Sequence, residues 1–252
     1  MNLVIDCGNS TTKIAVFDGE NIISKSVVVT LHITDIASIL HLYPIKNAVI
    51  SNVGIIPTDC IELIRKSVVV YIDLQSTTPI PLKNNYETPS TLGLDRLAVA
   101  VGANYLYPSR NILVIDAGTA ITYEFIDEYN TYQGGSISPG LVTRFKSLHH
   151  FTQRLPLVQP ENTIELFGRN TRAAILTGVI NGLVYEIEGY ITDFKQNYRD
   201  VLIFLTGGDI FYFDKKLKSS IFVSENLLLI GLNRIINFNA CLYTNTLQLY
   251  CR

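Results

Sequence analysis

The chain has 252 residues, enough for one large domain or two of about 125 residues each. Hydrophobic residues make up 48% and charged residues 17%, so a packed core is expected and extensive disorder is excluded. A net charge of −2 without a long basic run argues against nucleic-acid binding, which needs a cationic face. No apolar run approaches the roughly 18 residues of a membrane span, and no signal peptide is recognisable. The four scattered cysteines indicate free thiols in a reducing cytoplasm, because they lack metal-type spacing.

The first half of the chain is predicted to alternate strands and helices after a three-stranded opening. Asp18 and Gly19 form a strong hairpin signal between the second and third strands. A polar, proline-bearing loop is expected at 76–90. The expected strands cover 2–6, 12–17, 22–29, 47–53 and 68–73, and the expected helices cover 33–42, 58–66 and 92–106.

The second half repeats the opening of the first. The motif LVIDCG at 3–8 returns as LVIDAG at 113–118, and in each copy an apolar strand ends in a carboxylate and a glycine. This repeat predicts two mixed α/β domains, 1–108 and 109–252, each with helices packed on a sheet. In the second half, strands are expected at 111–116, 120–127, 131–137 and 201–206, and helices at 141–151, 171–196 and 225–238.

The first acid–glycine turn has the parts of a phosphate-binding loop. Gly8 lets the backbone approach a ligand, and the N–H groups of the turn can donate to phosphate oxygens. Asp6 can hold Mg²⁺ through water, because that ion prefers carboxylates together with substrate phosphates. A plain hairpin that satisfies its own backbone is the alternative interpretation. The remaining donors are the side chains of Asn9, Ser10, Thr11, Thr12 and Lys13.

The second acid–glycine turn supplies a matching half-site. Asp116 ends an apolar strand, where an ionised carboxylate is costly unless a cation or donors meet it. Thr119 can reach a phosphate, so the two turns are expected to close on a shared polyphosphate. The alternative is a carboxylate bonded to neighbouring backbone N–H groups. Gly207 and Gly208 follow a further apolar strand and could admit a flat adenine or form only a turn.

A third acid lies in the first turn of the helix predicted at 92–106. The helix N-terminus favours the ionised form of Asp95, which suits a group that accepts a hydroxyl proton during phosphoryl transfer. Arg96 could clamp a substrate carboxylate with its paired donors. The alternative is a surface acid that helps to cap the helix. Without further context, these residues do not decide between the two.

Taken in order, these motifs resemble the type III pantothenate kinase family of the acetate and sugar kinase/heat-shock 70/actin superfamily. The match runs from Asp6 to about Gly231, and the order and spacing of the motifs are more specific than any one of them. The motifs are DCGNSTTK, Tyr86 and Pro89 before GLDR, DAGTAIT, GGSISPGL, Leu155-Pro156, NTRAAI at 170–175, TGGD and LIGL at 229–232.

The resemblance implies two ribonuclease H-like/actin-like domains, each a mixed five-stranded sheet with flanking helices. It implies ATP-dependent phosphorylation of pantothenate to 4'-phosphopantothenate, the first step of coenzyme A biosynthesis, in a cytoplasmic homodimer. ATP would be used with Mg²⁺ and with a monovalent cation, K⁺ or NH₄⁺. The implied ATP-binding residues are Asp6, Cys7, Gly8, Asn9, Ser10, Thr11, Thr12, Lys13 and Thr119. The implied pantothenate contacts are Tyr86, Gly93, Leu94, Asp95, Arg96 and Thr171, and Asp95 would also accept the proton of the pantothenate hydroxyl. Asp116 would bind the monovalent cation, and Asp6 would bind Mg²⁺ through water.

The chain departs from the family pattern at three places. Ser10 stands where threonine is usual and keeps the hydroxyl, Thr88 replaces the usual asparagine before Pro89, and SNVG at 51–54 replaces SVVP. The last two are expected to alter local loop shape and, through it, substrate affinity. Two other functions stay open from the residues: a sugar or acyl kinase of the same superfamily, and a nucleotide-binding regulatory module without catalysis.

Overall fold

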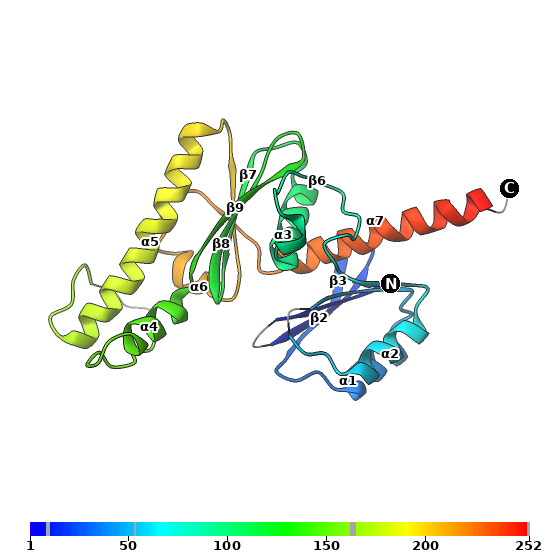
Figure 1. Ribbon diagram of the computed structural model, residues 1–252, viewed down its shortest axis with the longest axis horizontal. Helices are drawn as coiled ribbons and strands as arrows, with labels where there is room; N and C mark the ends of the chain where they lie inside the picture. Colours follow the sequence, from blue (N-terminus) through cyan, green and yellow to red (C-terminus); the bar gives the residue numbers. More distant parts are fainter. Residues whose placement is uncertain (9–10, 53, 162–164, 251–252) are drawn as a thin grey trace. The chain divides into compact units, whose positions relative to one another are not determined.

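The computed structural model describes residues 1–8, 11–52, 54–161 and 165–250. The chain forms two compact units (Figure 1). Unit 1 combines Met1–Leu106 with Leu227–Arg252, and unit 2 is Tyr107–Asn226. Each unit has its own hydrophobic core.

The sheet of unit 1 has five strands in the order β3-β2-β1-β4-β5. An antiparallel meander opens it, and β4 and β5 then add in parallel beside β1. Gly19 closes the two-residue hairpin between β2 and β3 with a φ of +59°, a conformation that glycine adopts without steric cost. The strands are β1 (Asn2–Cys7), β2 (Thr12–Asp18), β3 (Asn21–Val28), β4 (Asn47–Asn52) and β5 (Val70–Asp73).

Helices cover both faces of this sheet. On one face, α1 and α2 pack against apolar residues of β1, β2 and β4. Ile36 of α1 and Cys60 and Ile64 of α2 are buried in this contact. On the other side α7 contacts β1 and β4, and α3 packs along α7. The helices are α1 (Ile33–Leu42), α2 (Thr58–Ser67), α3 (Leu94–Leu106) and α7 (Leu227–Tyr250), with short β6 (Lys83–Asn84) and the 3-10 turn η1 (Pro89–Thr91) before α3.

Two glycines let α3 and α7 approach backbone to backbone. A methyl group on Gly231 of α7 would lie 1.8 Å from the carbonyl oxygen of Ala98. A methyl group on Gly102 of α3 would lie 2.3 Å from the carbonyl oxygen of Leu227. Because no side chain other than hydrogen fits at these contacts, the two glycines set the distance between the helices.

Asparagine side chains attach α7 to the sheet. The Nδ2 of Asn2 on β1 donates to Oδ1 of Asn233 at 2.8 Å and to Oδ1 of Asn237 at 2.7 Å. The Nδ2 of Asn47 on β4 donates in turn to Oδ1 of Asn2 at 2.9 Å. Asn2 and Asn233 are buried, so these amides are satisfied by one another rather than by water.

Unit 2 repeats the strand order of unit 1. Its strands follow the order β11-β10-β7-β8-β9, with β7, β8 and β9 as the antiparallel meander and β10 and β11 parallel to β7. The strands are β7 (Ile112–Ala117), β8 (Ala120–Ile126), β9 (Thr131–Pro139), β10 (Leu202–Thr206) and β11 (Phe222–Val223). The two LVIDxG segments therefore occupy the same central strand in the two units.

The core of unit 2 lies between this sheet and two helices. Figure 1 shows α5 (Thr171–Asn197) running along the sheet, with α4 (Leu141–His150) beside its N-terminal part. Fully buried Ile180, Leu183 and Ile187 of α5 pack on Ile115 and Leu205 of the strands. The short helix α6 (Ile210–Phe213) adds buried residues to the same cluster.

The expected fold class, two mixed α/β domains, is confirmed. The expected boundary between 108 and 109 lies beside the observed division after Leu106, but the expected second domain also contained α7, whose contacts are with unit 1. This helix continues to Tyr250, beyond its expected end at 238, and the end of the strand expected at 47–53 lies outside the described residues. No helix in the described part of the chain combines the length and apolar character of a bilayer-crossing segment.

Candidate functional site

The first acid–glycine turn joins β1 to β2 in unit 1. Its ends are tied together, because the N–H of Gly8 donates to the carbonyl oxygen of Thr11 at 3.0 Å. The hydroxyl of Thr12 donates to the buried Sγ of Cys7 at 3.5 Å. Asn9 and Ser10, two of the predicted ATP contacts, lie outside the described residues. The described part of the turn is thus a closed loop at the end of a buried strand.

Asp6 is a buried carboxylate at this turn and is 8% exposed. Burial raises its pKa from 3.8 to about 6; Lys13, its partner across the β1–β2 ladder, lowers the pKa and Asp95 raises it. A buried carboxylate with a raised pKa is destabilised when ionised and gains from a nearby cation. Because the charge of Asp95 raises this pKa, the carboxylates of Asp6 and Asp95 are close enough within unit 1 to repel each other.

Gly54 explains how one departure from the family pattern is accommodated. Its N–H donates to the carbonyl oxygen of Cys7 at 3.2 Å, a bond that proline could not make. A side chain here would collide, because a Cβ would lie 2.7 Å from the carbonyl oxygen of Gly8 and 2.9 Å from Sγ of Cys7. Glycine at position 54 therefore lets the segment after β4 pack directly on the turn.

The GLDR segment starts α3 and shapes the surroundings of Asp95. Asp95 Oδ1 accepts a hydrogen bond from the backbone N–H of Arg96 at 2.8 Å. A Cβ on Gly93 would lie 2.6 Å from the same oxygen, so the absence of a side chain at 93 makes room for the carboxylate. The guanidinium carbon of buried Arg96 lies 5.7 Å from the centre of the Tyr86 ring. The structure thus places Tyr86 beside the GLDR segment, and the role of these residues in binding pantothenate stays a prediction.

The second acid–glycine turn joins β7 to β8 in unit 2. Asp116 lies one residue before the end of β7, and Gly118 donates its N–H to the carbonyl oxygen of Ala120 at 3.1 Å. The carbonyl oxygen of Thr119 accepts from the N–H of Gly140 at 3.1 Å and from the Thr143 hydroxyl at 2.7 Å. The start of α4 is thereby fastened to this turn.

The TGGD segment at 206–209 is held against the same turn. The N–H of Asp209 donates to the carbonyl oxygen of Ala117 at 2.9 Å. Gly207 has a φ of +100° and packs so closely that a Cβ would lie 2.2 Å from that carbonyl oxygen. Burial raises the pKa of the Asp209 carboxyl. Unit 2 therefore gathers two of the glycine turns that the sequence singled out.

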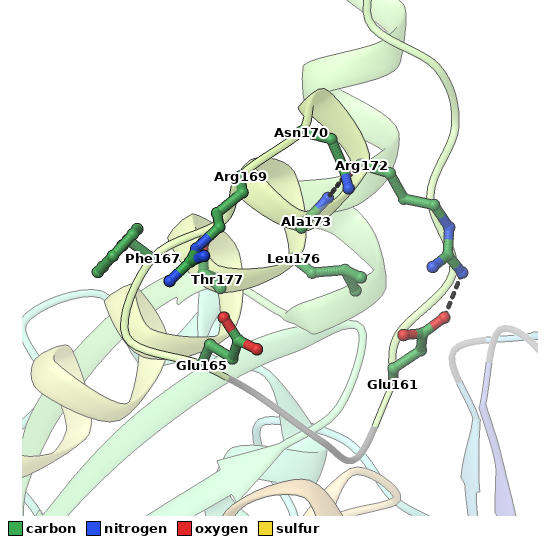
Figure 2. Close-up of a pocket in the computed structure, with 9 residues that line it drawn as sticks. All are labelled: Glu161, Glu165, Phe167, Arg169, Asn170, Arg172, Ala173, Leu176 and Thr177. Atoms are coloured by element: carbon green, nitrogen blue, oxygen red, sulfur yellow. Dashed lines mark hydrogen bonds and ion pairs between the residues drawn. The ribbon is translucent and has the colours of Figure 1, made fainter.

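Thr171 is the first residue of α5 and lines one of two hollows near the start of this helix. Asn170 caps the helix by accepting the N–H of Ala173 on Oδ1 at 2.9 Å. One hollow, of about 800 Å³, has Thr171 and Arg144 in a largely apolar wall between α4 and α5. The other, of about 510 Å³, contains Arg172 ion-paired with Glu161 (Figure 2). Thr171 thus belongs to unit 2, whereas the other predicted pantothenate contacts belong to unit 1.

One charged network in unit 2 could not be predicted from the sequence. Arg144 of α4 forms an ion pair with Glu186 of α5 and donates from Nη2 to the Ser138 hydroxyl at 2.8 Å. The Tyr123 hydroxyl donates to Glu186 Oε1 at 2.9 Å. Burial alone would raise the pKa of Glu186, but the bonds from Arg144, Ser138 and Tyr123 hold it below its usual value. No sequence spacing links these residues, because they come from four different elements.

The strand order of the two units and their acid–glycine turns define a class of protein. Two units with the same strand order, each with an acid at the end of its central strand, are the arrangement of the actin-like fold. Two solved structures share the fold: the activator of 2-hydroxyisocaproyl-CoA dehydratase from Clostridium difficile with bound ADPNP, and a glucokinase from an Antarctic psychrotroph. The activator has a TM-score of 0.51 at 13% identity, covering 98% of this chain and 97% of its own. The glucokinase has a TM-score of 0.50 at 12% identity, covering 94% and 98%.

Sequence comparison narrows this class to one family. The model of type III pantothenate kinase matches residues 2–193. Type III pantothenate kinases of Phocaeicola vulgatus and Bacteroides fragilis are 44% and 46% identical to the chain, each over 95% of it and over 99% and 98% of their own lengths. The chain belongs to the type III pantothenate kinase family.

Proposed function

We propose that this protein transfers the γ-phosphoryl group of ATP to the primary hydroxyl of pantothenate, the first step of coenzyme A biosynthesis in the cytoplasm. Family membership over nearly the whole chain supports this reaction. The observation that carries the residue assignment is the electrostatic effect of Asp95 on Asp6 within unit 1. That effect supports the proposal that the phosphate-binding turn and the candidate proton acceptor serve one site.

In the proposed reaction the hydroxyl oxygen of pantothenate forms a bond to the γ-phosphorus as the bond to the bridging oxygen of ADP breaks. Asp95 accepts the hydroxyl proton, and its bond from the N–H of Arg96 orients the carboxylate. Tyr86 and Arg96 position pantothenate, together with Gly93, Leu94 and Thr171. Most of the rate gain is expected from positioning and electrostatic stabilisation, since phosphoryl transfer needs little covalent chemistry from the protein.

The phosphate side of the site is assigned to the two acid–glycine turns. We assign ATP contacts to Thr119 and to residues 6–13, of which 9 and 10 lie outside the described residues. Asp6 suits a water-mediated Mg²⁺ contact, because a cation would offset the cost of its buried charge. Mg²⁺ would neutralise phosphate charge. Asp116 is assigned to a monovalent cation, K⁺ or NH₄⁺.

A homodimer is part of the same proposal. Unit 2 exposes large apolar side chains after α4 and before α5, and where such side chains form one patch they mark an interaction surface. Phe151 is 82% exposed, Leu166 76% and Phe167 60%. Light scattering on the purified protein should give twice the monomer mass, and a monomer that phosphorylates pantothenate at full rate would contradict the dimer.

The reaction is tested by coupled ADP release with pantothenate, using Asp95→Asn and a matched control. We expect turnover to fall by about 10²- to 10⁴-fold, the usual contribution of a general base, while ATP binding persists. Asp59→Asn is the control: Asp59 also lies in the first turn of a helix of unit 1 and also accepts the N–H of the next residue, at 2.9 Å. It should keep wild-type turnover.

The outcomes separate the alternatives. Equal turnover of wild type and Asp95→Asn would remove Asp95 from the mechanism. Phosphorylation of a sugar or an acyl carboxylate, with pantothenate ignored, would replace the proposed substrate. ATP binding without turnover on any acceptor would indicate a regulatory module.

A further inference from the structure

The start of α4 holds the turn of unit 2 that contains Thr119. Thr119 is exposed, and its carbonyl oxygen accepts the N–H of Gly140 at 3.1 Å and the hydroxyl of Thr143 at 2.7 Å. A Cβ on Gly140 would lie 2.0 Å from the carbonyl oxygen of Gly118 and 2.6 Å from that of Thr119. Because the turn and the first residues of α4 are in direct backbone contact, the position of one sets the position of the other.

Arg144 ties this part of α4 to two other elements. Its Nε donates to the carbonyl oxygen of Pro139 at 2.9 Å, and its Nη2 donates to the hydroxyl of Ser138 at 2.8 Å, both at the end of β9. The same Nη2 forms the ion pair with Glu186 of α5. A guanidinium group carries five donors in a rigid fork, so one side chain can hold a strand end and a second helix at once. A shift of α4 therefore disrupts several bonds together.

Glu186 is itself held by the strand that follows the turn. The hydroxyl of Tyr123 on β8 donates to Glu186 Oε1 at 2.9 Å. The Tyr123 ring stacks on Tyr190 of α5, with ring centroids 3.8 Å apart and an angle of 16° between the ring planes. The side chains of Arg144 and Glu186 are each only 24% exposed, so water screens their ion pair less than a pair at the open surface. Glu186 therefore offers Arg144 a partner whose position is already fixed.

We propose that Arg144 is a positioning residue for ATP. Held by Glu186, it fixes the start of α4, and through Gly140 and Thr143 it sets the position of Thr119. This inference rests on the proposed function, which assigns Thr119 to ATP. It adds Arg144 and Glu186, two residues outside the acid–glycine turns that act on the nucleotide only through that turn.

A direct role of Arg144 in binding a ligand is the competing explanation. Arg144 lines the hollow of about 800 Å³ between α4 and α5, where a guanidinium group would attract an anion. Its Nε and Nη2, however, already donate to oxygens of the protein, and the wall of the hollow is largely apolar. The geometry therefore favours positioning, and the two roles differ in which substrate they affect.

The test measures nucleotide affinity directly, without pantothenate. ADPNP, an ATP analogue that does not transfer its γ-phosphoryl group, is titrated with Mg²⁺ into wild type and Arg144→Ala by isothermal titration calorimetry. Circular dichroism at the same temperature checks that each variant is folded. We expect the Kd for ADPNP to rise about 10- to 100-fold, the range found when a group that orients the ligands of a bound metal is removed. The KM for pantothenate, from coupled ADP release at saturating ATP, should stay at the wild-type value.

Two sets of variants follow the same path through the structure. Thr143→Val removes one bond to the Thr119 carbonyl oxygen and should weaken ADPNP binding, whereas Thr143→Ser keeps the hydroxyl and should bind as wild type does. Glu186→Gln should weaken binding through Arg144. The double variant Arg144→Ala/Glu186→Gln should then bind no more weakly than Arg144→Ala, because residues that act in one network are not additive. A further loss in the double variant would overturn the role of Glu186.

Glu188→Ala is the matched control. Glu188 lies two residues after Glu186 on α5 and is also partly buried. It accepts the N–H of Ser219 at 3.2 Å and the hydroxyl of Ser219 at 2.8 Å, so its partner lies in another segment than β9 and α4. This variant should lower the stability of unit 2 and leave the Kd for ADPNP unchanged. It thereby separates positioning from a general loss of stability.

Three results would overturn the inference: an unchanged Kd for ADPNP in Arg144→Ala, an equal loss of affinity in Glu188→Ala, or a rise in the KM for pantothenate alone. The last result would assign Arg144 to the hollow. If Arg144→Ala does not fold, Arg144→Gln takes its place in the same comparison. Weaker ADPNP binding by Arg144→Ala supports the inference even if pantothenate is not phosphorylated, so its failure and that of the proposed reaction are distinguishable.

Discussion

The contact between α3 and α7 leads to a prediction about both stability and catalysis. In Gly231→Ala the new methyl group would lie 1.8 Å from the carbonyl oxygen of Ala98, whereas ordinary contact begins at 3.4 Å. The two backbones must therefore separate by roughly 1.5 Å, which breaks close packing along the interface. The obstacle is a backbone carbonyl and cannot move aside as the end of a flexible side chain can.

The expected loss of stability is large. Overpacking that side chains can absorb costs about 1–3 kcal/mol, so we expect Gly231→Ala to lower the free energy of unfolding by about 3 kcal/mol or more. Turnover should fall as well, because Asp95 lies in the first turn of α3. A displacement of a catalytic group by about 1 Å can cost on the order of 10²-fold in rate.

Urea unfolding followed by circular dichroism, together with coupled ADP release, measures both effects. Gly189→Ala is the matched control: Gly189 is exposed in the middle of α5, and a Cβ there meets nothing within 4 Å. This variant should gain up to about 1 kcal/mol from better helix propensity. If Gly231→Ala unfolds at the same urea concentration as wild type, the close approach of the two helices is refuted.

Two further predictions concern the buried polar groups of unit 1. Asp6 titrates near 3.8 when unfolded and near about 6 when folded, so the folded state holds an extra proton between these values and stability falls as pH rises through them. Asp6→Asn should therefore become more stable relative to wild type by about 2 kcal/mol in unfolding free energy as the pH rises from 4 to 7. A difference independent of pH would contradict the raised pKa. Asn2→Ala removes the donor to Asn233 and Asn237, so it should lower the urea midpoint, with a loss of about 2–4 kcal/mol. An unchanged midpoint would show that these bonds do not hold α7 in place.

Much of the fold could be predicted because its elements carry local signals. The alternation around Asp18 and Gly19 identifies the hairpin, and the six-residue repeat identifies the central strand of each unit. The elements that were missed, β6, η1, α6 and β11, have two to four residues each, too few for a periodic pattern.

In the candidate site too, features encoded by a local motif could be predicted. The GLDR motif predicted a helix start with an acid in its first turn, and the structure adds that Gly93 leaves room for Asp95 Oδ1. Contacts between distant segments could not be predicted, because no local pattern encodes them. The network of Arg144 and Glu186 and the packing of α7 on unit 1 are of this kind.

The return of α7 to unit 1 has a consequence for the order of events at the ribosome. Unit 2 is one continuous segment, and all residues of its hydrophobic core lie within it. Unit 1 lacks the helix that covers one face of its sheet until Leu227–Tyr250 has been translated. During synthesis unit 1 therefore keeps apolar surface exposed until α7 has been made. Unit 2 can complete its hydrophobic core before that.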